Sequence, residues 1–190
     1  MVEPARRGPI VRLTRWLARR SQAPALPLML PVFPATDFVF PVMPNQLLLV
    51  ALSMLAPERW LAFALAFAVG GAIGGAAIAV AIQSFGLDIG KLLGPLRENA
   101  DAARVFAAIR ENGLWFMAAV ALLPWTPRLT VLVCAALGIA PLAIGLTLVV
   151  TRLVPACALA LIGAKSPKLA LRSPWVRKFI AGLGELPPPS

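Results

Sequence analysis

Three ionisable side chains lie inside apolar stretches of this sequence, where charges are rare. Arg128 follows the prolines of "LPWTPRL", Arg152 lies at the centre of a long apolar run, and Asp37 precedes "FVFPVMPN". A charge at membrane depth costs at least about 2.5–3.5 kcal/mol, so it requires a partner or a ligand. The arginine fork matches the oxygens of a phosphate group. The two arginines therefore predict either a phosphate-binding site or a structural ion pair, for example between Arg152 and Asp37.

Uncharged polar side chains stand beside the same proline motifs. The candidate donors to a phosphate group are Asn45, Gln46, Thr126 and Thr130. Helices that begin at Asn45 and at Arg128 would each direct free backbone N–H groups and a partial positive charge at an anion. Asn45 is equally well explained as a helix cap. Asp37 is the candidate for proton coupling or for an ion pair.

The sequence offers little for catalysis or metal binding. It contains no histidine, and Cys134 and Cys157 both lie in apolar runs. This composition excludes histidine-based triads and most zinc sites. We therefore expect no enzyme activity, no metal and no cofactor, and we interpret each cysteine as a small buried apolar residue.

The composition indicates an integral membrane protein. Of the 190 residues, 59% are hydrophobic and 14% are charged, whereas soluble domains are about a quarter charged. Six arginines precede Ala23 and five basic residues follow Gly163. Basic flanks mark the cytoplasmic side, so both termini are expected in the cytoplasm. A nucleic-acid partner is not expected, because the basic groups flank apolar spans.

The apolar segments come in two lengths. Residues 61–82 and 141–163 are each long enough to span a bilayer. Residues 46–56 make about a dozen residues of helix, or roughly 18 Å, which is too short to cross. The stretch 114–139 is broken by "PWTPR" into halves of similar length. Span 61–82 carries two overlapping small-residue pairs that predict close helix packing; these pairs are Gly70 with Gly74, and Gly71 with Gly75.

The short segments repeat at an interval of 83 residues. Pro41 and Pro44 correspond to Pro124 and Pro127, and each pair is followed by a half-length apolar helix, a turn and a full span. Short, proline-broken segments at corresponding positions in two halves indicate an inverted-repeat transporter. These four prolines are therefore interpreted as hairpin breaks.

The predicted fold is all-α and integral to the membrane, with two re-entrant helical hairpins in an inverted repeat, full transmembrane helices and flanking amphipathic helices. Its expected parts are a basic amphipathic N-terminal segment (1–22), a membrane domain (23–163) and a basic cytoplasmic tail (164–190). The membrane domain is expected to comprise hairpin 26–56, span 61–82, amphipathic connector 83–112, hairpin 113–139 and span 141–163. If both hairpins were kinked full spans, the termini would still be cytoplasmic, but the connector would lie in the cytoplasm; its near-neutral charge favours the re-entrant form.

Two segments of the chain resemble a known protein family. The segments "FVFPVMPNQLLLVAL…AFAVGGAIGGAAIAV" and "ENGLWFMAAVALLPWTPRLTVLVCAALGIAPLAIGLTLVVTRLVPACALALIG" are similar to the DedA family, also called SNARE-associated or VTT-domain proteins, and to its small YqaA-like branch. The resemblance covers about residues 36–163. It implies two facing re-entrant hairpins and movement of lipids across a bilayer, often coupled to protons. The chain departs from the family pattern at Asn45, where an acidic residue is usual, and at Thr151, where glycine is usual.

The leading functional hypothesis is a multi-pass transporter or flippase of a bacterial-type inner membrane. Its substrate would be an anionic, phosphate-bearing lipid, either a polyprenyl phosphate or a phospholipid, and Asp37 is the candidate for coupling its transport to protons. The alternative is a membrane scaffold or envelope-integrity protein that does not transport, in which the glycine face assembles a complex or a homodimer and the arginines are structural. A membrane enzyme that acts on lipid phosphates would need a nucleophile or metal ligands, and the sequence, with no histidine and no clustered acids, does not favour it. A channel for cations or protons is not favoured either, because the expected pocket is positively charged.

Overall fold

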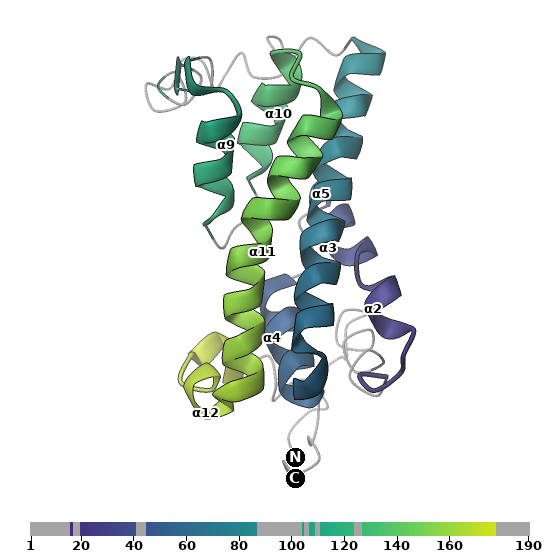
Figure 1. Ribbon diagram of the computed structural model, residues 1–190, viewed down its shortest axis with the longest axis vertical. Coiled ribbons are helices and arrows are strands. Elements are labelled where there is room, and N and C mark those ends of the chain that lie inside the picture. Colours follow the sequence, from purple (N-terminus) through teal and green to yellow (C-terminus); the bar gives the residue numbers. More distant parts are fainter. Residues whose placement is uncertain are drawn as a thin grey trace, which may run out of the picture. The chain divides into compact units, whose positions relative to one another are not determined.

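The computed structural model describes residue 16, residues 20–40, 45–86, 104, 107–108, 111–123 and 127–177 (Figure 1). Within these ranges every regular element is helical. The elements are α2 (Leu26–Met29), α3 (Val32–Asp37), α4 (Asn45–Leu55), the 3₁₀ helix η1 (Pro57–Arg59), α5 (Trp60–Phe85), α9 (Leu114–Ala121), α10 (Arg128–Ala136), α11 (Pro141–Lys165) and α12 (Pro167–Ala170). The predicted all-α class is therefore confirmed for these residues. Most of the predicted connector 83–112 lies outside them.

The chain divides into two compact units. Unit 1 consists of Met1–Leu30, Met43–Ala66 and Ala156–Ser190, and unit 2 consists of Pro31–Val42 and Phe67–Pro155. The long helices α5 and α11 contribute residues to both. The predicted hairpin 26–56 is divided as well, because α3 belongs to unit 2 while α2 and α4 belong to unit 1.

The prolines of the first apolar stretch begin helices rather than only breaking them. A proline occupies the first turn of α2, and Pro31 is the N-cap residue of α3. Proline is tolerated at these positions, since the first N–H groups of a helix have no intrahelical acceptor. The segment 26–37 therefore contains two short helices that the sequence analysis did not predict.

The two span-length helices are confirmed and extend slightly beyond their predicted ends. Helix α5 has 26 residues and α11 has 25. At about 1.5 Å per residue each is close to 40 Å long, which exceeds the roughly 30 Å of a bilayer core. Both are apolar enough to cross a membrane. Pro155 lies inside α11 and cannot donate to the carbonyl one turn earlier.

Helices α9 and α10 are short and pack against each other in unit 2. Gly138 ends α10 with a φ of +77°, in the left-handed region that glycine adopts without strain. The Ile139 N–H then donates to the carbonyl of Cys134 at 3.1 Å, and the Gly138 N–H donates to that of Ala135 at 3.1 Å. This is a Schellman motif, which satisfies the last carbonyls of the helix.

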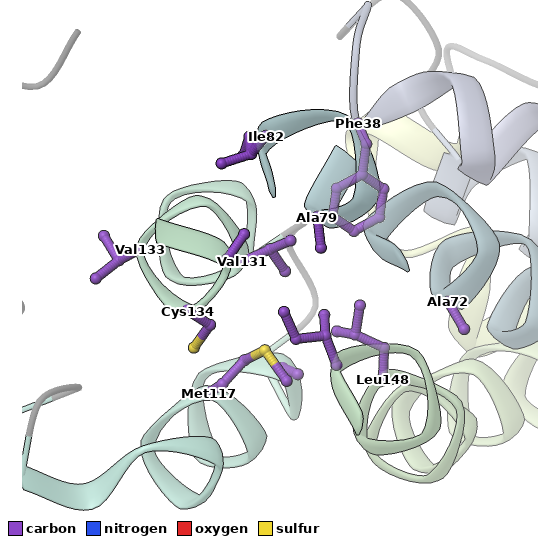
Figure 2. Packing of buried hydrophobic residues seen from close by; sticks show 12 residues of the cluster. Phe38, Ala72, Ala79, Ile82, Met117, Val131, Val133, Cys134 and Leu148 are labelled. Atoms are coloured by element: carbon purple, nitrogen blue, oxygen red, sulfur yellow. The ribbon is translucent and has the colours of Figure 1, made fainter. Parts of the chain in front are cut away.

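The core of unit 2 forms where α10 meets its neighbours. Figure 2 shows Val131 directed toward Ala79 and Phe38, while Cys134 and Met117 lie together on another side of α10. All five side chains are buried. Helix α10 is thus enclosed by apolar contacts from α5, α9 and the end of α3, which fixes the position of its first residue, Arg128.

Unit 1 has a core of its own. Val50 and Ala51 of α4 are buried together with Ala170 and Val176 from the C-terminal region. Gly163 of α11 lies against α4 so closely that a Cβ there would be 2.7 Å from the carbonyl oxygen of Val50. Close helix contact at glycine thus operates in this unit also.

Helix α3 lies against the glycine face of α5. A Cβ at Gly74 would lie 2.6 Å from the carbonyl oxygen of Ala35 and 2.8 Å from its Cα, and a Cβ at Gly70 would collide with Pro31 and Pro34. At Gly75 the neighbours are Leu148 and Phe38, whereas a Cβ at Gly71 meets nothing within 4 Å. Gly70 and Gly74 therefore permit α3 to approach the α5 backbone.

We expect Gly74→Ala to lower the free energy of unfolding by about 1–3 kcal/mol, because the added methyl group meets rigid backbone of α3. Gly71→Ala is the matched control, since its Cβ enters open space, and a helical Gly→Ala change there should stabilise by about 0.5–1 kcal/mol. Denaturant unfolding of both variants in detergent micelles makes the comparison. Equal effects of the two changes would contradict the close approach.

Candidate functional site

An ion pair between Asp37 and Arg128 joins two helices of unit 2. The Arg128 Nη2 lies 3.1 Å from the Asp37 Oδ1, and the two side chains are 33% and 8% exposed. Asp37 is the last residue of α3, and Arg128 is the first residue of α10. Because the carboxylate is almost completely removed from solvent, it depends on a cation for stabilisation.

The positions of these residues in their helices add to the need for pairing. A carboxylate at a helix C-terminus and a guanidinium at a helix N-terminus each face a partial charge of their own sign. Asp37 and Arg128 occupy these two unfavourable positions. Their contact offsets both repulsions, and it holds the end of α3 against the beginning of α10.

The guanidinium of Arg128 retains donor capacity. Its Nε is buried and has no hydrogen-bond acceptor within the described ranges. An arginine has five N–H donors, and the contact to Asp37 joins one guanidinium nitrogen to one carboxylate oxygen. A second anionic or carbonyl oxygen is chemically suited to the remaining donors.

Arg152 brings a second guanidinium to the same carboxylate. Its Nη1 donates to the carbonyl oxygen of Leu123 at 3.3 Å, and Asp37 attracts it electrostatically. Arg152 lies two residues from the exposed Val150 and Val154, about 200° around α11, so its charge points away from the apolar side of the helix. Asp37 thus pairs with one guanidinium and attracts a second, so these three side chains together carry one net positive charge. The ion pair measured at 3.1 Å is with Arg128, and the pair Asp37–Arg152 that the sequence suggested stays a prediction.

Thr130 does not show the role predicted for it, which was to donate a hydrogen bond to a phosphate group. Its side chain is buried, and its hydroxyl donates to the carbonyl oxygen of Pro127 at 2.8 Å. This bond is the backward bond that threonine commonly makes inside a helix, and it uses the one hydroxyl proton. The other predicted hydroxyl, that of Thr126, lies outside the described residues.

Asn45 and Gln46 belong to unit 1, where they begin α4. The Oδ1 of Asn45 is buried without a hydrogen-bond partner in the described part of the chain, so it does not accept a cap bond from the backbone of α4. The suggested cap role is therefore not seen. Both residues stay predictions as phosphate ligands.

Of the four prolines interpreted as hairpin breaks, Pro41, Pro44 and Pro124 lie outside the described residues. Pro127 is buried and is the N-cap residue of α10. Its carbonyl oxygen accepts the N–H of Val131 at 3.1 Å as well as the Thr130 hydroxyl. Pro127 thus starts the helix that presents Arg128.

Gln83 is a positioning residue that sequence analysis assigned to the connector. It lies near the end of α5, and its Nε2 donates to the carbonyl oxygens of Ala135 and Ile139 at 3.2 and 2.8 Å. These carbonyls lie at and just beyond the C-terminal end of α10, so Gln83 ties α5 to α10. The sequence shows Gln83 only as an amide at the end of a long apolar segment, because its hydrogen-bond acceptors depend on the tertiary structure.

The described residues contain no cluster of three or more His, Cys, Asp or Glu that could hold a metal ion. Cys134 and Cys157 are both free thiols. Comparison of the chain with protein families, curated proteins and solved structures gives no match. The charged cluster of Asp37, Arg128 and Arg152 is therefore the feature of the chain that bears on its function.

We expect Asp37→Asn to lower the free energy of unfolding by about 2 kcal/mol, because it leaves Arg128 without its counter-charge. Arg128→Met removes the other partner, and the double variant should lose at least about 0.5 kcal/mol less than the sum of the two single changes. Denaturant unfolding of the four proteins in detergent micelles measures this coupling. Strictly additive losses would show that the ion pair contributes nothing to stability.

Proposed function

We propose that the chain is an integral membrane protein that binds the phosphate group of an anionic lipid at Arg128 and Arg152 and moves that lipid across the bilayer. The observation that carries the proposal is the cluster in unit 2, in which Arg128 pairs with the nearly buried carboxylate of Asp37 and that carboxylate also attracts Arg152. The resemblance to the DedA family points to the same activity.

Membrane insertion is supported by the apolar side chains that the long helices expose. Their large exposed residues recur at intervals of four along α11 (Leu142, Leu146, Val150, Val154) and along the first part of α5 (Leu61, Leu65, Val69, Ile73). The most apolar 18-residue windows of α11 and α5 are only 22% and 56% buried. A core helix of a soluble protein would cover this surface, and lipid chains are the solvent that suits it.

The excess charge of the cluster supports an anionic ligand. In an apolar region a net positive charge is costly, and a phosphate group supplies both a negative charge and acceptors for N–H donors of Arg128. The headgroup replaces part of the contact between Asp37 and Arg128. A proton on Asp37 would weaken that contact and release Arg128, so coupling to protons is part of the proposal.

The lengths of α9 and α10 suit a re-entrant hairpin. With 8 and 9 residues they are about 12 and 14 Å long, less than half of a bilayer core. A pair of such helices enters the membrane and returns on the same side. The proposal places α5 and α11 as full spans, both termini in the cytoplasm, and the chain in a bacterial-type inner membrane.

The scaffold alternative retains only Gly71 of its proposed surface in this fold, because a Cβ there meets nothing within 4 Å. It assigned the glycine face to a partner helix, but Gly70 and Gly74 already lie against α3 of the same chain. A helix from another protein cannot occupy the same positions.

We expect Arg128→Ala to reduce the binding of a phosphate-bearing lipid about tenfold to a hundredfold, which is the usual loss for a charge-assisted contact. The measurement is native mass spectrometry of protein in mild detergent with undecaprenyl phosphate or phosphatidylglycerol, against diacylglycerol as the lipid without phosphate. Flipping of a fluorescent phospholipid in liposomes by the same variant should fall in parallel.

Two variants make that experiment specific. Arg104→Ala removes the same charge at an exposed position outside the cluster and should keep both binding and flipping. Arg128→Lys keeps the charge but loses the fork, so partial activity is expected. Equal lipid on wild type and a folded Arg128→Ala protein would refute the phosphate site and leave Arg128 as a structural residue.

The re-entrant topology predicts that residue 99 lies on the side opposite the termini. A single cysteine in Asn99→Cys, with Cys134 and Cys157 replaced by serine, should react with a membrane-impermeant maleimide added to the periplasmic side of spheroplasts. Reaction only after permeabilisation would place the connector in the cytoplasm and would contradict the re-entrant arrangement.

A further inference from the structure

The chain beyond α11 is folded back rather than extended. It turns through α12 into Pro174–Arg177, and backbone hydrogen bonds hold it, including Leu171 N–H to the Pro167 carbonyl at 2.9 Å and Arg177 N–H to the Ser173 carbonyl at 3.0 Å. Ala170 and Val176 are buried in the core of unit 1. We call Lys165–Arg177 the tail platform. Its buried residues anchor it, so the side chains between them are held in place.

Basic side chains of the tail platform surround a hollow of about 500 Å³. Lys165, Lys168 and Arg172 line it together with Ser166, Pro167 and Leu169, and Arg177 is exposed nearby in the sequence. The sequence has no acidic residue between Glu111 and Glu185, so no carboxylate of this segment offsets the charge. The hollow is therefore complementary to an anion.

Exposed apolar side chains alternate with these basic residues. Trp175 is 73% exposed and Leu169 is 51% exposed. A soluble surface rarely combines an exposed tryptophan, exposed leucines and several cations, whereas a membrane interface favours all three. The platform also follows directly from α11, whose exposed apolar side chains suit lipid. This continuity favours a lipid surface over a nucleic acid or an acidic protein.

We infer that the tail platform is a docking site for the headgroups of anionic phospholipids at the membrane surface, with Lys165, Lys168 and Arg172 around a headgroup phosphate. Trp175 and Leu169 insert at the level of the headgroups. The site is separate from the Arg128 cluster: it requires α11 to lie in a membrane, but it does not require the chain to transport lipid.

The test titrates the full chain in mild detergent with phosphatidylglycerol and, separately, with phosphatidylcholine, and counts bound lipids by native mass spectrometry. Every protein carries Arg128→Ala, so that the proposed transport site does not contribute. We expect tighter binding of phosphatidylglycerol, a loss of about a hundredfold when Lys165, Lys168 and Arg172 are all changed to Gln, and weakening at high salt.

The matched control changes Arg97, Arg104 and Arg110 to Gln, which removes the same total charge elsewhere in the chain. It should bind phosphatidylglycerol like the parent protein. If the glutamine variant fails to fold, a second triple variant takes its place, with Lys165→Arg, Lys168→Arg and Arg172→Lys. This variant keeps the charge and should retain lipid binding. Trp175→Ala should weaken lipid binding at least severalfold. Equal binding of the two lipids, equal loss in the control triple, or no effect of Trp175→Ala would overturn the inference.

Discussion

The arrangement of unit 2 depends on a carboxylate that is almost removed from solvent. Asp37 lies where its own helix opposes its charge, and a buried carboxylate without a cation would cost several kcal/mol. Arg128 meets this requirement directly, and Arg152 adds attraction from α11. The charge of Asp37 therefore acts on residues of two other helices. The three side chains carry one net positive charge, which links the stability of the unit to its proposed ligand.

The position of Asp37 in turn depends on residues that carry no charge. Helix α3 is only six residues long and cannot hold itself in place, so its location comes from packing. Gly70 and Gly74 let its backbone approach α5, and Phe38 then enters the apolar core beside Ala79 (Figure 2). At the other side of the pair, Gln83 and the Gly138 turn fix the end of α10. Small residues and one amide thus position the ion pair.

The two basic regions of the chain differ in their chemistry. Arg128 and Arg152 are half-buried and already interact with protein groups, so an anion there must compete with a carboxylate and a carbonyl. The lysines and arginines of the tail platform are exposed and lie beside exposed apolar side chains. Salt screens exposed charges much more than buried ones. A selective site and a salt-sensitive surface contact are therefore both consistent with one chain rich in arginine and lysine.

The sequence alone determined the features that follow from composition and period. The sequence was sufficient to predict the all-helical class of the described residues, the two span-length helices, the short helices α4, α9 and α10, and the isolation of Arg128 and Arg152 among apolar residues, because length and hydropathy are local properties. Only the tertiary structure decided the contacts. It paired Asp37 with Arg128, committed the Thr130 hydroxyl to Pro127, and placed α3 on the glycines of α5. The reason is physical: a polar group takes the partner that packing brings within about 3 Å, and packing joins segments far apart in the chain.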